Sequence, residues 1–322
     1  MRSLCFVALM SVVGMSPALA GDALSWLHRM NQASRSTNFA GIYVYESGGR
    51  SESARITHVT DGSGQQERLE SLDGAPREVI RFNDEVKTFL PNERLVVIDR
   101  AATGSFPGRL VAAMGGLSDF YVIRMGETGK VATRDAQAIR LEPRDDMRYG
   151  HELWADVGSG LLLKARMLKS SAEVIEQFAY SEIQIGPQVD REKVKARYSR
   201  GSDWKVVNAR GVDLRPEEAG WAFNGLPPGF RQISLSRRPI RKDAPEALHA
   251  VFSDGLASVS VFIEPGGGRS VPPTQNLLGP VSMYRSTRAD AVVTAVGEVP
   301  PAALKRIAEG VTPANPPPAG KN

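Results

Sequence analysis

The chain has 322 residues with 40 Lys and Arg against 36 Asp and Glu, which gives a formal net charge of +4. So small an excess does not indicate a nucleic-acid-binding protein, because such domains carry concentrated positive charge. The length is sufficient for two hydrophobic cores. The single cysteine, Cys5, excludes an intramolecular disulfide.

Residues 1–20 have the pattern of a cleavable signal peptide. Met1-Arg2 supplies a positive start, Leu4–Val13 an apolar core, and Ala18-Leu19-Ala20 a small-residue cleavage site. A membrane-spanning helix needs about 20 apolar residues, and Pro17 interrupts this run earlier. We therefore expect export, which in a Gram-negative cell places the protein in the periplasm.

Residues 21–187 are predicted to form one curved antiparallel sheet that follows a helix. Asp22 is suited to cap a helix over Ala23–Ser34. Short strand-like runs follow, separated by turn residues such as Asp61-Gly62 and Asp73-Gly74. Longer strands are expected over Ala138–Glu142, Met147–Asp156, Leu161–Ser170 and Val174–Ile185. Consecutive antiparallel strands of this length predict a strongly curved sheet or an open barrel.

A Gly-rich apolar segment, Gly104–Gly116, interrupts this series of strands and is predicted to form a short helix or a lid. Such an architecture can enclose a ligand, and the candidates for lining a lipid cavity are Leu110, Val111, Met114, Leu117 and Phe120. The alternative is that these side chains simply fill the concave face of the sheet.

A second domain is expected over residues 218–312, after a charged linker at 188–217. Its clearest feature is a hairpin over His249–Glu264, in which Asp254-Gly255 suits a tight turn with positive φ. Ala257, Val259, Val261 and Ile263 alternate with serines, as in a half-buried strand. Pro300-Pro301 fits the start of a helix that ends at Gly310. Residues 313–322 are Pro-rich and predicted to be disordered.

The sequence contains no recognisable catalytic or metal-binding arrangement. None of the histidines His28, His58, His151 and His249 has another His or Cys at metal-ligand spacing. Gly158-Ser159-Gly160 lacks the flanking glycines of a nucleophile elbow and is better interpreted as a hairpin turn. We therefore predict no catalytic residues, no metal and no cofactor.

Basic residues are concentrated between Arg197 and Lys242. This stretch is either a solvated linker or a docking patch for an acidic partner or an anionic lipid. Within it, Arg237, Arg238 and Arg241 are the candidates for binding a partner.

The chain also carries an ordered series of short segments. They are WLHRMNQAS at 26–34, SLDGAPREVIR at 71–81, RYGHELWAD with SGLLLKARML within 148–168, EQF at 176–178, LPPGF at 226–230, SRRP at 236–239, FSDGLASVSVFIE at 252–264 and VGEVPPAALKRIAEG at 296–310. In this order and behind a signal peptide, they resemble the MucB/RseB family of periplasmic sigma-factor regulators over nearly the whole mature length.

The resemblance implies an α+β fold that is mostly antiparallel β. The larger domain, 21–187, would be a half-open β-barrel similar to the lipoprotein carrier LolA, with covering helices, and the C-terminal domain would be smaller and α+β.

The resemblance also implies a function. The protein would bind the periplasmic part of a membrane anti-sigma factor of the RseA/MucA type and shield it from site-1 proteolysis. It would sense envelope stress through lipid or lipopolysaccharide-type ligands. The alternative is a periplasmic lipid or lipoprotein carrier of the LolA type, which bound acyl chains would favour. The oligomeric state stays open, a homo-oligomer included.

Overall fold

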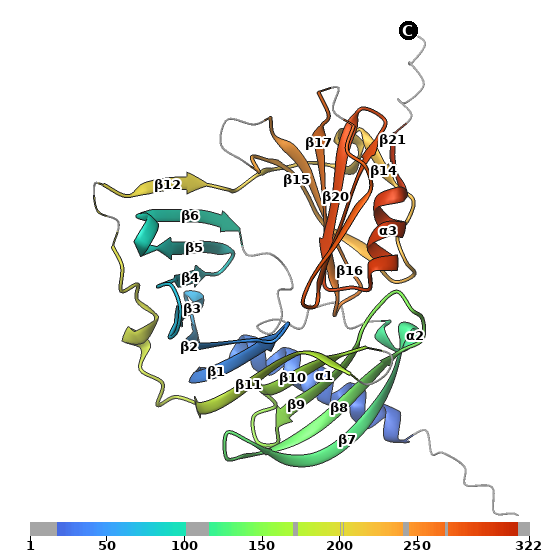
Figure 1. Cartoon of the computed structure of the whole chain (residues 1–322). Helices are drawn as coiled ribbons and strands as arrows, with labels where there is room; N and C mark the ends of the chain where they lie inside the picture. Colours follow the sequence, from blue (N-terminus) through green and yellow to red (C-terminus); the bar gives the residue numbers. More distant parts are fainter. Residues whose placement is uncertain are drawn as a thin grey trace, which may run out of the picture.

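The protein consists of two open β-sheets placed one above the other, each with a helix on one face (Figure 1). The computed structural model describes residues 18–100, 116–169, 173–199, 201, 203–240, 245–267 and 270–314. The expected class is confirmed: the chain is mostly antiparallel β, with a large half-open sheet and a smaller α+β unit. No helix within the described ranges is both long and apolar enough to cross a bilayer.

The first sheet has 12 strands in the order β12-β6-β5-β4-β3-β2-β1-β11-β10-β9-β8-β7. Its strands are β1 (Phe39–Ser47), β2 (Arg50–Asp61), β3 (Gly64–Ser71), β4 (Glu78–Phe82), β5 (Glu85–Leu90), β6 (Leu95–Arg100), β7 (Tyr121–Val131), β8 (Arg134–Pro143), β9 (Gly150–Asp156), β10 (Leu162–Leu168), β11 (Val174–Ile185) and β12 (Lys205–Asn208). All neighbours pair antiparallel except β12 and β6, which are parallel. The two edge strands, β12 and β7, do not pair with each other, so the barrel stays half open.

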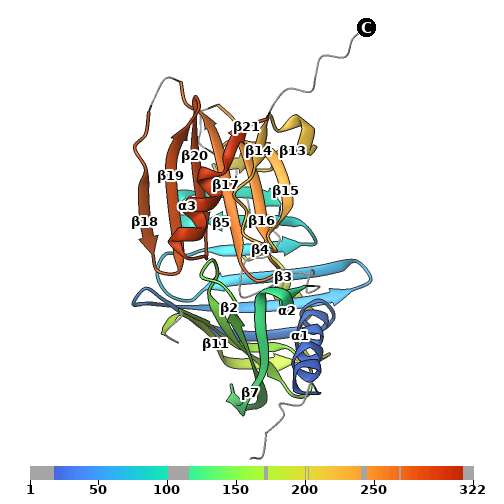
Figure 2. The same ribbon diagram turned by 90° about the vertical axis from the view of Figure 1, so that its right-hand side faces the viewer.

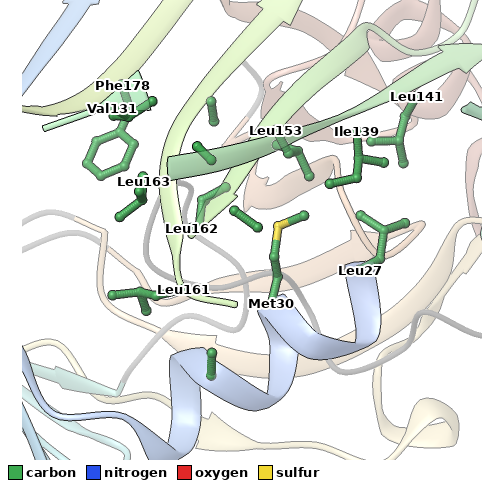
Figure 3. Packing of buried hydrophobic residues seen from close by; sticks show 14 of the residues in the cluster. Leu27, Met30, Val131, Ile139, Leu141, Leu153, Leu161, Leu162, Leu163 and Phe178 are labelled. Atoms are coloured by element: carbon green, nitrogen blue, oxygen red, sulfur yellow. The ribbon is translucent and has the colours of Figure 1, made fainter. Parts of the chain in front are cut away.

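Helix α1 (Ala18–Ser36) covers the concave face of this sheet. Ala23, Leu27 and Met30 are completely buried and lie on one face of the helix, as expected for positions four and three residues apart. Figure 3 shows Leu27 and Met30 directed at Ile139 and Leu153 of the sheet. The burial of these side chains fixes the helix on the sheet, since each fully buried Leu or Met contributes about 1.5–3 kcal/mol.

The second sheet has seven strands in the order β13-β15-β16-β17-β20-β19-β18. They are β13 (Val212–Asp213), β15 (Arg231–Arg238), β16 (Ala247–Ser253), β17 (Ser258–Pro265), β18 (Thr274–Leu278), β19 (Val281–Arg288) and β20 (Ala291–Gly297). A small sheet pairs β14 (Trp221–Phe223) with β21 (Val311–Pro313). Helix α3 (Pro301–Glu309) lies on the seven-stranded sheet (Figure 2) and buries Leu304 and Ile307. The helix expected after Pro300 is thereby confirmed.

The hairpin between β16 and β17 differs from the tight turn that the sequence predicts. The last paired residues are Ser253 and Ser258, so the loop has four residues, Asp254 to Ala257. Only Gly255 has a positive φ, of 106°. The prediction of a tight turn was wrong because the Asp254 carboxylate stabilises a wider loop, in which it accepts hydrogen bonds from the backbone N–H groups of Leu256 and Ala257. The predicted burial of the second strand is confirmed, with Val259 and Val261 completely inaccessible.

The segment between the two sheets follows the outer edge of the first one. It contains two short 3₁₀ helices, η2 (Arg191–Val194) and η3 (Pro216–Glu218), whereas a third, η1 (Pro91–Glu93), connects β5 to β6. Val194 of η2 packs with Val59 and Val189 in a small separate cluster, and β12 adds to the edge at β6 (Figure 1). The predicted linker thus contributes a strand to the first sheet, and the domain boundaries themselves stay a prediction.

Candidate functional site: the junction between the two sheets

Arg148 is the centre of a buried polar junction between the sheets. It lies between β8 and β9, and its side chain is inaccessible to solvent. Its Nη1 donates to Asp254 Oδ2 at 2.7 Å, while Nη2 donates to the Pro228 carbonyl at 2.7 Å. Nε and Nη2 donate to the two carboxylate oxygens of Asp145, both at 3.0 Å. A buried guanidinium is tolerated only with such complete pairing.

Asp254 uses its two carboxylate oxygens for two different purposes. Oδ1 accepts hydrogen bonds from the backbone N–H groups of Leu256 and Ala257, both at 2.9 Å, and so shapes the hairpin loop. Oδ2 accepts from Arg148 and, at 3.0 Å, from the Tyr121 hydroxyl. Burial of Tyr121, followed by the charge of Asp254, raises the pKa of this phenol well above its ordinary value. The hydroxyl therefore stays protonated and donates to Asp254.

Aromatic rings surround the Arg148 guanidinium. Its Cζ lies 5.0 Å from the ring centroid of Phe120, 5.6 Å from that of Tyr121 and 5.5 Å from that of Phe230. Such contacts are favourable when the cation is desolvated. Gly229 permits the close packing, because it has a φ of +87° and a Cβ atom there would lie 2.4 Å from the Phe120 ring. The guanidinium is thus enclosed by aromatic rings as well as paired with carboxylates.

A second group of ion pairs joins the edge of the first sheet to the second. Arg238 of β15 donates to Asp99 of β6 at 2.7 Å, and Arg100 pairs with Asp213 of β13. Arg210, in the connection between β12 and β13, pairs with Glu85 of β5. These pairs are partly or largely exposed, so each contributes little to stability on its own.

The candidate partner-binding arginines have different surroundings. Arg237 is exposed on β15, whereas Arg238 is half-buried and engaged with Asp99. Arg241 lies outside the described residues. The structure therefore brings Arg237 and Arg238 to one strand but on opposite faces, and their role in partner binding stays a prediction.

The candidate lipid-cavity residues are only partly described. Leu110, Val111 and Met114 lie outside the described residues. Leu117, in the short helix α2 (Leu117–Phe120), is buried in the core of the first sheet. Phe120 is half-buried against Arg148 and Gly229. In this conformation both packed side chains fill space rather than surround a ligand, and the lipid-binding role stays a prediction.

A cavity of about 690 Å³ lies at a further contact between the sheets. Three of the residues that line it are Gly48 in the β1–β2 turn, Arg166 on β10 and Gly279 in the β18–β19 turn. A Cβ atom on Gly48 would lie 3.3 Å from the Cα of Gly279, so the two turns touch at their glycines. The buried carboxyl of Glu176, on β11, lines this cavity.

The sequence interpretation missed Arg148 and Glu176, and it singled out Asp254 only as a residue of the hairpin turn. The signal for Glu176 was available, because strand alternation places it on the face that carries Phe178 and Tyr180, both buried. A carboxyl in line with core side chains indicates a special environment. Arg148 gave no comparable local signal, and nothing in the sequence near Asp254 indicated its pairing with Arg148.

His151 is buried beside the junction. Burial lowers the pKa of His151 to about 4, so the ring stays neutral. It lies 6.4 Å from the Tyr121 ring, measured between centroids. Across the described part of the chain, no group of three or more His, Cys, Asp or Glu side chains is placed to hold a metal ion.

Comparison with known proteins identifies the family. Residues 22–198 match the MucB/RseB N-terminal domain, and residues 215–312 match the MucB/RseB C-terminal domain. The chain belongs to the MucB/RseB family. The resemblance found in the sequence is thereby confirmed.

Relatives within this family are named as regulatory proteins. The sigma factor AlgU regulatory protein MucB of Pseudomonas aeruginosa is 32% identical over 321 residues, which cover 97% of this chain and 98% of the relative. The sigma-E factor regulatory protein RseB of Escherichia coli K12 is 29% identical over 297 residues, 88% of this chain and 89% of the relative. These names agree with the prediction of a regulator rather than an enzyme.

Solved MucB structures share the fold. A crystal structure of MucB in complex with MucA(peri) superimposes with a TM-score of 0.71 at 30% identity, over 91% of this chain and 100% of that chain. The MucA/MucB complex of Pseudomonas aeruginosa gives a TM-score of 0.72 at 30% identity, over 91% of this chain and 99% of that chain.

Proposed function

We propose that this member of the MucB/RseB family binds the periplasmic part of a membrane anti-sigma factor of the MucA type and shields it from site-1 proteolysis. One observation carries the proposal: MucB was crystallised with MucA(peri), and that MucB chain matches 91% of this chain with a TM-score of 0.71. A match over 91% of this chain supports a partner surface built from the same elements as in MucB.

Shielding follows from binding if the bound segment is inaccessible to the protease. Cleavage then proceeds only through the free anti-sigma segment, whose fraction falls as the regulator concentration exceeds Kd. The compartment in which this binding would occur is the periplasm. Residues 1–20 would direct the chain there as a cleaved signal peptide.

Lipid or lipopolysaccharide-type ligands would act as the signal for release. A ligand that binds better to the free regulator than to its complex must lower the affinity for the anti-sigma segment by linkage. The half-open sheet supports this proposal by its shape. Leu27 and Met30 of α1 fill its concave face, so an acyl chain entering there would displace the helix.

The proposal is tested by mixing the mature chain with the periplasmic segment of the MucA-type protein and adding the site-1 protease. Slower cleavage in the presence of this chain is expected. The chain is added in large excess over the anti-sigma segment. Equal cleavage rates with and without the chain under this condition would overturn the proposal. Repeating the assay with lipopolysaccharide tests the release step, for which the expected result is restored cleavage.

A further inference from the structure

The segment that joins the two sheets lies on the face of the first sheet opposite to α1. We call its residues 188–199 and 203–208 the strap. Ile56 of β2 belongs to the core that α1 covers, and alternation along the strand directs Val59 to the other face. On that face Val59 is buried against Val194 of the strap. Figure 1 shows the strap running along the outside of β2 to β6 before it ends as β12.

The strap covers a row of buried side chains. Glu78 of β4, Phe89 of β5 and Val96 of β6 are direct cross-strand neighbours, and the register across β2 to β4 places them on the same face as Val59. Their exposed fractions are 0%, 6% and 3%. The ring of Trp204 in the strap makes a T-shaped contact with Phe89, with the centroids 6.1 Å apart. The strap therefore packs as part of the first sheet.

Glu78 holds the strap by its backbone. The carboxylate accepts hydrogen bonds from the Arg197 N–H, 3.0 Å from Oε1 and 3.1 Å from Oε2. Oε2 also accepts from the Tyr198 N–H at 3.2 Å. Nε of Arg68, on the neighbouring strand β3, donates to Oε1 and supplies the opposite charge. A carboxylate can be fully buried here because all of these contacts are with donors.

Beyond the strap, the chain crosses to the second sheet within three residues, Ala209 to Gly211. β12 ends beside β6, and β13 begins beside β15. Gly211 lies so close to β15 that a Cβ atom there would be 2.8 Å from the Arg237 carbonyl oxygen. The position of β12 on the first sheet therefore determines where the second sheet is attached.

Ion pairs flank this crossing. They join β5 or β6 to the chain beyond β12, and their members are Arg238 with Asp99, Arg210 with Glu85 and Arg100 with Asp213. Single pairs with this exposure contribute little to stability. They can orient the second sheet only while the crossing is short and both of its ends are fixed.

We propose that the strap is a conformational lock: Glu78 fixes it on the first sheet, and its release frees the angle between the two sheets. Release lengthens the free connection from residues 209–211 to residues 188–211, so the flanking ion pairs no longer hold one orientation. The buried pair of Arg148 with Asp254 stays closed, and the second sheet turns about it. The lock lies in the chain itself and is independent of the proposed function.

Glu78→Gln tests the lock at the sheet without changing the size of the side chain. The carboxylate contacts only N–H donors in this site, so an amide NH₂ group in place of either oxygen faces a donor. Losing a hydrogen bond to a charged group shifts an equilibrium about tenfold or more. Trypsin reads this shift at Arg191, Lys193 and Lys195, because cleavage follows the population of the opened segment. We expect cleavage there to be about tenfold faster than in the wild type.

A matched pair of variants tests the lock from the strap. Arg197→Pro removes the backbone N–H that Glu78 accepts and leaves the sheet unchanged. Arg197→Ala keeps this N–H and loses only the exposed ion pair with Glu70. We expect faster strap cleavage in Arg197→Pro and wild-type cleavage in Arg197→Ala. This pair decides the question if Glu78→Gln does not fold. Glu67→Gln, on the opposite face of β3 beside His58, is the control for the sheet and should be cleaved as the wild type is.

The angle between the sheets is measured by double electron–electron resonance between two nitroxide labels. The chain from residue 21 onwards contains no cysteine, so Glu127→Cys on β7 and Gln275→Cys on β18, both exposed, provide unique sites. We expect one narrow distance distribution in the otherwise wild-type chain and a broader one when Glu78→Gln or Arg197→Pro is added. Unchanged strap cleavage in both of these variants overturns the lock. Faster cleavage with an unchanged distance distribution overturns its control of the angle.

Discussion

Arg148 and Asp254 are 106 positions apart in the chain, yet Nη1 of the arginine lies 2.7 Å from Oδ2 of the aspartate, and both side chains are completely buried. This ion pair ties the connection between β8 and β9 to the hairpin loop of the second sheet. The same aspartate shapes its own loop, so the geometry of the loop and the position of the two sheets depend on one residue.

The first prediction concerns this ion pair. Asp254→Asn leaves Arg148 buried with a weaker partner, and breaking a buried pair costs about 3–5 kcal/mol. We expect a loss at the lower end of this range, because Asp145 still pairs with the guanidinium. Urea unfolding measures it. The control is Asp213→Asn at the exposed pair with Arg100, for which a loss within about 1 kcal/mol is expected. Equal small losses in both variants would contradict the structural role of Asp254.

The second prediction separates close packing from backbone strain. Gly229→Ala introduces a Cβ atom 2.4 Å from the Phe120 ring at a φ of +87°. Gly220→Ala has a similar φ of +69° with no atom within 4 Å of the new Cβ. In both variants the alanine is forced into the left-handed conformation, which destabilises the fold by about 1 kcal/mol. Only Gly229→Ala must also displace Phe120. A larger drop in Tm for Gly229→Ala is therefore expected, and equal drops would mean that Phe120 is not held against this turn.

The third prediction concerns pH. The pKa of Glu176 is raised from 4.5 to about 7 by burial and by Glu298, so the folded chain retains a proton that the unfolded chain releases. The resulting stability is fully present below pH 4.5 and is lost as the pH rises to about 7. Over this window the wild type should lose about 3 kcal/mol from this group. Glu176→Gln should show a shallower fall, whereas Glu173→Gln should follow the wild type. Parallel curves for wild type and Glu176→Gln would show that Glu176 is not buried.

The fourth prediction concerns the exposed arginine of β15. Arg237→Glu should weaken binding of the anti-sigma segment severalfold, mainly at low salt, if the basic surface attracts an acidic partner. Arg231→Glu, exposed at the start of the same strand, is the matched control. Titrations at low and high salt measure both variants. Identical affinity and salt dependence for wild type and Arg237→Glu would remove Arg237 from the interface. Arg238→Glu is less informative, because it also breaks the pair with Asp99.

The sequence predicted those features that depend on neighbouring residues. Alternation over Ala257–Ile263 predicted a half-buried strand, and the paired prolines before Leu304 predicted α3. The turns at Asp61-Gly62 and Gly158-Ser159-Gly160 were also confirmed. Each of these signals reports a backbone conformation or a face within one element.

The junction could not be predicted because its partners are distant in sequence. The Asp254-Gly255 pattern indicated a tight turn, but the Asp254 carboxylate also accepts a hydrogen bond from Arg148, in the connection between β8 and β9 of the first sheet. Similarly, β12 has only four residues and pairs in parallel with β6 through a long connection, which gives no hairpin signal. The family resemblance supplied the fold of both units but carried no information on these contacts.

The most direct test of the proposed function compares two concentrations. Binding of the mature chain to the MucA-type periplasmic segment gives a Kd, and site-1 cleavage of that segment at increasing regulator concentrations gives the concentration of half-protection. If the bound segment is shielded, half-protection occurs at the Kd and cleavage approaches zero at saturation. Unchanged cleavage of a saturated complex would contradict the account.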